Sequence, residues 1–173
     1  MNELCNFMAP LMLLSMKYLK IIAFFLVVGG IYFFYLFIPN RIMISGNDYF
    51  PKAANDPNKG ITQIQYWDKW MPYQKIEGHS FVFENSKLDV QEAFISSAKS
   101  NFSMDNTNAP LIISALDAGN DSTYVRYECS IDNRSFSPIL RWQNYASSKK
   151  MEVQILKIMK AAKDYYSNPA MNK

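Results

Sequence analysis

The sequence predicts an α+β protein, with one N-terminal transmembrane helix followed by a domain in which a curved antiparallel sheet surrounds a long C-terminal helix. Three observations predict it. An uncharged apolar run occupies positions 21–38, short runs with strand periodicity fill positions 80–131, and apolar residues recur at helical spacing from Met151 to Tyr166. The chain of 173 residues suffices for one ordinary domain plus an accessory segment.

The apolar run Ile21–Ile38 is long enough to cross a membrane. Its 18 residues would cover roughly 27 Å as a helix, close to a bilayer core of about 30 Å. A cleaved signal peptide is the main alternative, but its apolar part is shorter and ends in small residues, whereas this run closes in Tyr35-Leu36-Phe37-Ile38-Pro39. We therefore predict a short segment over 1–17 and a transmembrane helix over 18–39.

Basic residues beside the span indicate its orientation. Lys17 and Lys20 lie directly before the apolar run, whereas Arg41 and Lys52 follow it. Positive charge close to a span favours the cytoplasmic side. We therefore expect a cytoplasmic N-terminus and a domain on the outer side of the membrane, periplasmic or extracellular.

Charge and cysteine content exclude several classes of function. Residues 41–168 contain 15 basic and 14 acidic residues, a net charge of +1. No nucleic-acid partner follows from so small a charge. Cys5 and Cys129 fall on opposite sides of the predicted membrane, so a disulfide within the chain is not expected. Cys129 lies in an alternating strand and is interpreted as a small core residue.

The soluble domain is expected over residues 41–168, with 169–173 as a tail. It begins with a short strand, Arg41–Ser45. Asp56 can cap a helix that starts at Pro57 and runs to about Gln65. The aromatic segment Tyr66–Tyr73 follows and is interrupted by a proline.

Strands are expected throughout the middle of the domain. Turn residues at 85–86, 105–108 and 117–121 separate them. The expected strands are Ser80–Glu84, Lys87–Val90, Glu92–Ala98, Asn101–Met104, Ala109–Leu116 and Ser122–Ile131. The last alternates most regularly, with Val125, Tyr127, Cys129 and Ile131 on one face and Tyr124, Arg126, Glu128 and Ser130 on the other. Such alternation is typical of an antiparallel sheet with one covered face.

A long amphipathic helix is expected to end the domain. Pro138 suits its first turn, and the chain reaches Asn168-Pro169 at its end. Its apolar stripe contains Met151, Ile155, Ile158, Met159, Ala162, Tyr165 and Tyr166. Lysines lie mostly away from this stripe, so that face is expected to be solvated. A gap between a curled sheet and this helix is where an apolar ligand would bind.

The element order and three short segments resemble the START-like (SRPBCC) superfamily, in its polyketide cyclase/dehydrase and lipid-transport branch. Ile42-Met43-Ile44 resembles the first strand after a membrane anchor, and Trp67-x-x-Trp70-x-Pro72-Tyr73 resembles the W-x-x-W-x-P-aromatic motif. Ser137-Pro138-Ile139-Leu140-Arg141-Trp142 resembles the N-P-hydrophobic-x-R turn that opens the final helix. The run at 50–54 departs from the usual apolar-Pro-Pro pattern.

The resemblance implies a helix-grip fold with a hydrophobic cavity between sheet and last helix, in a bacterial protein. It does not imply one chemistry, because a fold hosts many functions. We expect the cavity to be lined by Val125, Tyr127, Ile155, Ile158 and Met159, with Trp67 and Trp70 near its entrance. Packing of the two tryptophans in the core is the competing interpretation.

No catalytic group of residues emerges from the sequence. A metal site needs clustered His, Cys, Asp or Glu, and His79 is the one histidine. It lies 50 positions from Cys129 in the chain, with nothing to bring the two together. We therefore expect no cofactor and no metal.

The leading hypothesis is a membrane-anchored, non-enzymatic domain that binds an apolar small molecule or lipid. A closed domain that acts through an unidentified protein partner at the cell envelope is the alternative. A cyclase-like enzyme using Tyr124, Arg126 or Glu128 is a third hypothesis. It requires the opposite face of that strand to point into the domain.

Overall fold

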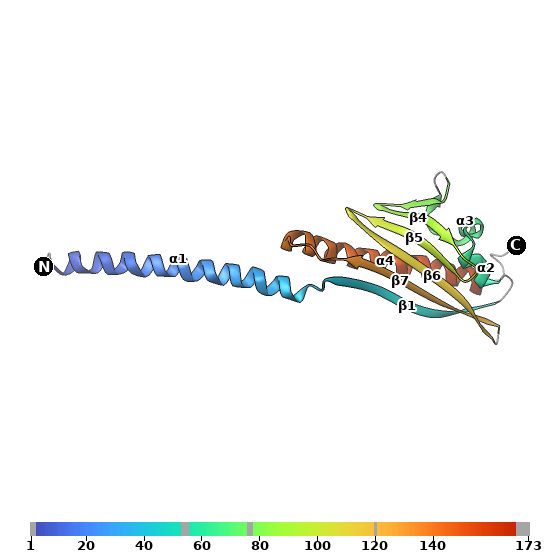
Figure 1. Ribbon diagram of the computed structural model, residues 1–173, viewed down its shortest axis with the longest axis horizontal. Coiled ribbons are helices and arrows are strands. Elements are labelled where there is room, and N and C mark those ends of the chain that lie inside the picture. Colours follow the sequence, from blue (N-terminus) through green and yellow to red (C-terminus); the bar gives the residue numbers. More distant parts are fainter. Residues whose placement is uncertain (1–2, 53–55, 76–77, 120, 169–173) are drawn as a thin grey trace. The chain divides into compact units, whose positions relative to one another are not determined.

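The structure is a computed structural model that describes residues 3–52, 56–75, 78–119 and 121–168. It divides into two compact units, Met1–Pro39 and Asn40–Lys173 (Figure 1). Helix α1 makes up most of the first unit. The second contains the sheet and the remaining helices.

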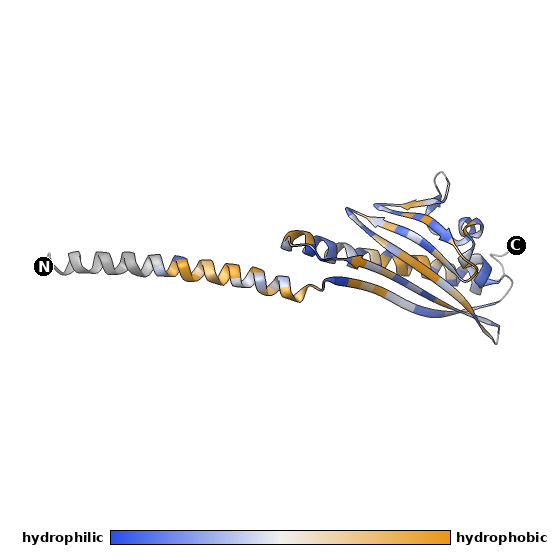
Figure 2. Ribbon diagram, viewed as in Figure 1, coloured by the Kyte–Doolittle hydropathy of each residue, from blue (hydrophilic) through white to orange (hydrophobic). Residues whose placement is uncertain are grey.

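Helix α1 extends over Glu3–Phe37 and so begins well before the predicted span. Leucine, methionine and alanine, which favour helices, fill much of the chain ahead of Tyr18. The helix ends two residues before Pro39, whose ring disfavours helical geometry in the residue before it. Its segment Tyr18–Phe37 has 20 residues and a mean hydropathy of 2.2, and hydrophobic residues predominate along it (Figure 2). By length and composition it is suited to a membrane anchor or to a signal sequence.

The second unit contains a seven-stranded antiparallel sheet with the strand order β1-β7-β6-β5-β4-β3-β2 (Figure 1). Neighbouring strands pair with each other along the sheet. Its strands are β1 (Arg41–Pro51), β2 (Gln74–Lys75), β3 (Ser80–Phe83), β4 (Ser86–Ala93), β5 (Ser97–Met104), β6 (Thr107–Gly119) and β7 (Ser122–Asp132).

Alternating side chains assign one face of this sheet to the core. In β7, Val125 and Cys129 are fully buried, whereas Arg126 between them is exposed. The same alternation runs through β5 and β6. The face assignment made from the sequence is therefore confirmed, because a pleated strand points successive side chains to opposite faces.

Several predicted strand boundaries were wrong. β1 continues to Pro51 rather than ending at Ser45, because all its residues pair with β7. The predicted strand Glu92–Ala98 is split by the turn between β4 and β5, in which Ile95 is 94% exposed. The prediction was wrong here because the apolar residues of this exposed turn resemble those of a strand in the sequence.

Two of the hairpin turns differ from the prediction: the β3–β4 turn is shifted by one residue, and the β5–β6 turn is shorter. Glu84-Asn85 connects β3 to β4, and Ser86 begins β4 because it pairs with Phe83. Its hydroxyl also donates to the Phe83 carbonyl at 2.7 Å. The β5–β6 turn uses only Asp105-Asn106. Glu84 and Asp105 both have a φ of 51°, the left-handed conformation that such two-residue turns require. Part of the turn predicted at 117–121, Asn120, lies outside the described residues.

Short helices connect β1 to β2: α2 (Pro57–Thr62), the 3₁₀ helix η1 (Ile64–Tyr66) and α3 (Trp67–Trp70). Asp56 caps α2 as predicted, its Oδ1 accepting from the Asn58 N–H at 3.0 Å. The helix predicted to reach Gln65 ends instead at Thr62. The indole N–H groups of Trp67 and Trp70 donate hydrogen bonds to carbonyl oxygens near its end.

Helix α4 (Pro138–Ser167) packs along the inner face of the sheet (Figure 1). Ser137 caps it, and Pro138 occupies its first turn as predicted. All seven residues of the predicted apolar stripe are buried in the same cluster as the inner face of the sheet. The α+β arrangement of a sheet that surrounds a C-terminal helix is therefore confirmed.

Candidate functional site

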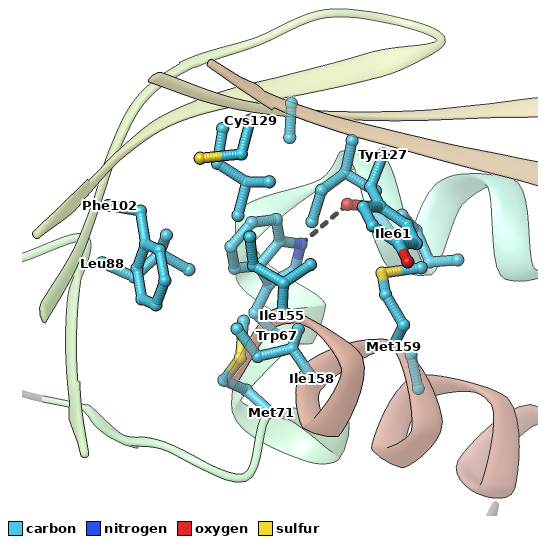
Figure 3. Close-up of a cluster of buried hydrophobic side chains, with 14 of the residues drawn as sticks. Ile61, Trp67, Met71, Leu88, Phe102, Tyr127, Cys129, Ile155, Ile158 and Met159 are labelled. Atoms are coloured by element: carbon cyan, nitrogen blue, oxygen red, sulfur yellow. Dashed lines mark hydrogen bonds between the residues drawn. The ribbon is translucent and has the colours of Figure 1, made fainter. Parts of the chain in front are cut away.

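The predicted cavity residues lie in the core between sheet and α4. All seven belong to one cluster of buried side chains: Trp67, Trp70, Val125, Tyr127, Ile155, Ile158 and Met159. Trp67 is fully buried and lies between the side chains of α4 and those of the sheet (Figure 3). None of these residues lines the wall of either pocket described below. The structure therefore brings them together as packing partners, and a ligand role for them stays a prediction.

Both tryptophans are fixed by hydrogen bonds to α2. The indole Nε1 of Trp67 donates to the Ile61 carbonyl at 2.8 Å, and that of Trp70 donates to the Gly60 carbonyl at 3.0 Å (Figure 3 shows the first). These carbonyls lie near the end of α2, where continuing helix would otherwise supply the donors. The tryptophans thus end α2 and join it to the core, which is a packing function.

A pocket opens where α2, η1 and α3 meet the end of α4. Its volume is about 270 Å³, and we call it the α2–α4 pocket. Three tyrosines and two lysines form most of its wall, with one acidic residue and one glycine. The lining residues are Asp56, Lys59, Gly60, Tyr66, Lys69, Tyr165 and Tyr166.

Close packing between Gly60 and Tyr166 shapes the floor of this pocket. A Cβ on Gly60 would lie 1.6 Å from the Tyr166 Oη, so only glycine leaves room for that ring. Tyr166 is 2% exposed and contacts Tyr165 edge-on, with ring centroids 5.1 Å apart. Burial raises the pKa of Tyr166 above its ordinary value, so its hydroxyl stays protonated and can donate a hydrogen bond.

The rim of the α2–α4 pocket is cationic and aromatic. The Lys69 ammonium lies 5.6 Å from the centroid of the Tyr66 ring, within the range of a cation–π interaction. Lys59 and Lys69 are both exposed, whereas the carboxylate of Asp56 already accepts the α2 cap bond. Two exposed ammonium groups in a wall that contains three tyrosines favour an aromatic or amphipathic anion over a cation.

The residues named for a cyclase-like enzyme lie on the opposite face of the sheet from the core. Tyr124, Arg126 and Glu128 line an open depression of about 350 Å³ together with residues of β6. Arg126 forms an ion pair with Glu128. Because the buried face of β7 is the one predicted, these three residues do not point into the space between sheet and α4.

The two other candidate reactive residues are Cys129 and His79. Cys129 is fully buried, and burial raises the pKa of its thiol to about 12. His79 is exposed in the turn that precedes β3. Among the described residues, no group of three or more His, Cys, Asp or Glu side chains is arranged to hold a metal ion.

We expect the Cys129 thiol to resist alkylation in the folded protein at about pH 8, because only the thiolate is nucleophilic and the pKa is about 12. Full-length protein carrying Cys5→Ser, treated with iodoacetamide in detergent, should keep its unmodified mass. The same protein in denaturant should gain one adduct. Rapid modification under native conditions would show that the thiol is accessible.

Comparisons with known proteins find no matching family model and no matching curated protein. Solved structures of similar arrangement are DynU16 from the dynemicin biosynthetic locus (TM-score 0.49, 9% identity, 73% of this chain and 47% of that chain), Ara h 8.0201 (0.48, 12%, 74% and 99%) and a START superfamily protein from Mycobacterium smegmatis (0.43, 12%, 70% and 97%). The chain spans about half the length of DynU16.

These matches include a protein of the superfamily that the sequence resembles. All three have TM-scores below 0.5 and identities of 12% or less, so no ligand, activity or family membership follows from them. The helix-grip arrangement rests on the strand order and on the burial of α4.

Sequence reasoning did not identify the α2–α4 pocket. The helical spacing predicts Tyr165 and Tyr166 only as part of the apolar stripe, and no pattern in the sequence marks Lys59 or Lys69 as a site residue. One signal was present: Gly60 lies inside a short predicted helix, where glycine is unfavourable unless another group approaches closely. The identity of that group, Tyr166, depends on folding over more than 100 residues of chain.

Proposed function

We propose that this protein is a membrane-anchored, non-enzymatic module that binds a small aromatic or amphipathic anion in the α2–α4 pocket. The observation that carries the proposal is the wall of that pocket, in which three tyrosines and two lysines surround about 270 Å³. This volume is near the lower end for ligand pockets, which suits a compact ligand. Helix α1 supports the anchoring through the length and hydropathy of Tyr18–Phe37.

The chemistry of the wall supports an anion with an aromatic or apolar body. Tyrosine rings offer faces for stacking, and their hydroxyls offer hydrogen bonds. The ammonium groups of Lys59 and Lys69 supply charge at the rim, where a carboxylate, sulfate or phosphate would remain partly solvated. Binding in the space between sheet and α4 would require Trp67 to move, which makes the α2–α4 pocket the more accessible site.

Naphthoate and its neutral analogue naphthamide form a matched pair of probes for this proposal. In calorimetric titration, full-length protein in detergent micelles should bind naphthoate more tightly than naphthamide. Naphthoate should also raise its melting temperature, as mass action requires of a native-state ligand. Lys69→Ala should weaken naphthoate binding by about tenfold, or about 1.4 kcal/mol. Lys160→Ala, which removes an exposed α4 lysine away from the pocket, should leave binding unchanged.

The filled core favours a second candidate, a closed module that works through a protein partner. Its interior side chains, including Trp67 and Ile155, are fully buried against one another. Equal, weak binding of both probes in wild type and Lys69→Ala would reject the anion site. That result would make the closed module the leading function.

A further inference from the structure

Four large apolar side chains are exposed around the start of α4. Phe136 is 98% exposed, Ile139 72%, Trp142 45% and Leu140 44%. We call these residues the α4-start patch. Apolar residues exposed singly need no explanation, but a group of them in a folded domain commonly marks a surface that another phase or molecule covers.

A buried asparagine holds the patch beside the first residues of the second unit. Asn133 is fully buried, and its backbone N–H donates to the Asn40 carbonyl at 2.8 Å. Its side-chain Nδ2 lies 3.4 Å from the Arg141 carbonyl, to which it donates, and its Oδ1 accepts from the Asn144 Nδ2 at 3.1 Å. The start of α4 is thereby fixed to the chain at Asn40.

The chain itself limits how far this end of the domain lies from α1. Arg41 pairs with Asp132, the last residue of β7. Helix α1 ends at Phe37, and the four steps from Phe37 to Arg41 span at most about 14 Å. Any bilayer that holds the C-terminal end of α1 is therefore close to the connection that bears the α4-start patch.

We propose that the α4-start patch contacts the bilayer in which α1 is embedded, so that the domain rests on the membrane surface by this end. The inference depends on the proposed anchoring by α1. Tryptophan and other aromatic residues favour the boundary between headgroups and acyl chains. Arg134, two residues after the end of β7, has a side chain that is 76% exposed and forms an ion pair with Asp132 at 2.6 Å, so the charge of this cation is already paired.

Ile95 provides a matched control at the other end of the sheet. It is 94% exposed and lies in the β4–β5 turn, and its carbonyl lies 3.4 Å from the Thr62 hydroxyl, which donates to it. The strand registers place this turn at the end opposite Asp132. A probe at position 95 therefore reports an equally exposed apolar site that is not expected to contact lipid.

The experiment places an environment-sensitive fluorophore at Phe136→Cys or Ile95→Cys in the full-length chain carrying Cys5→Ser, reconstituted into phosphatidylcholine vesicles. At position 136 we expect a blue-shifted emission and loss of most of the intensity when nitroxide-labelled lipid is included. At position 95 we expect neither change. Carbonate extraction of the same vesicles tests the anchoring separately.

The outcomes separate the two proposals. Extraction of the chain by carbonate would overturn the anchoring, and the membrane contact with it. A retained chain whose two probes respond alike would overturn the contact alone. A blue shift at position 136 without quenching by nitroxide lipid would also overturn it, because a protein surface or a second copy would then cover the patch.

Discussion

Replacing Trp67 by alanine is expected to lower the free energy of unfolding by about 3–5 kcal/mol, the range for truncating a buried tryptophan. The side chain is fully buried between α4 and the sheet, and its ring lies 5.8 Å from that of Phe81 and 5.5 Å from that of Trp70. The substitution also leaves the Ile61 carbonyl without its donor. Denaturant titration of full-length protein in detergent, followed by the far-ultraviolet signal, measures the loss.

Two further variants test the explanation. Trp67→Phe keeps an aromatic ring but removes the Nε1 donor, so it should cost about 1–3 kcal/mol, the penalty for an unsatisfied buried group. Trp142→Ala removes a tryptophan that is 45% exposed and should cost much less than Trp67→Ala. Equal losses for Trp67→Ala and Trp142→Ala would contradict a central packing role for Trp67.

Gly60→Ala is expected to destabilise the protein by about 1–3 kcal/mol, the usual cost of overpacking. The added Cβ would lie 1.6 Å from the Tyr166 Oη and 2.6 Å from its Cζ, so the buried ring must shift. Alanine favours helix over glycine by about 1 kcal/mol, which offsets part of this cost. Because Gly60 and Tyr166 both line the α2–α4 pocket, the variant should also weaken naphthoate binding.

A double-mutant cycle isolates the clash. Removing the ring with Tyr166→Ala should make a subsequent Gly60→Ala nearly neutral, so the two losses should not add. Gly29→Ala is the matched control, because a Cβ there meets nothing within 4 Å. If the losses of unfolding free energy for Gly60→Ala and Tyr166→Ala were additive, the clash would be excluded. The cost of Gly60→Ala would then not come from contact of the added methyl group with the Tyr166 ring.

Local periodicity was sufficient to predict the sheet face and the last helix. In β7 and α4, the burial pattern of the structure matches the spacing of apolar residues in the sequence. Both elements are long, and each buries one side, so the hydrophobic effect imposes the same period on sequence and structure. The Asp56 cap was predictable for a different reason, because its bond to Asn58 is local.

Contacts between distant residues could not be predicted in this way. Helix α2 ends at Thr62 because Trp67 and Trp70 satisfy its last carbonyl oxygens, and a periodicity argument does not include side-chain donors. The periodicity argument also fails for exposed apolar residues: it predicts Phe94 and Ile95 as part of a strand, although both are exposed between β4 and β5. The α2–α4 pocket depends on Tyr166 meeting Gly60, which no local pattern encodes.

The pairing of β1 with β7 also determines how the domain would bear tension. β1 is an edge strand, all 11 of its residues pair with β7, and the chain toward α1 leaves from its first residue. A pull through Asn40, opposed by a hold at the far end of α4, acts along the axis of β1. It loads the ladder in shear, so that the interstrand hydrogen bonds resist together instead of opening one after another. Force applied through Asn40 would therefore meet a strong attachment, and the domain should remain folded under that load.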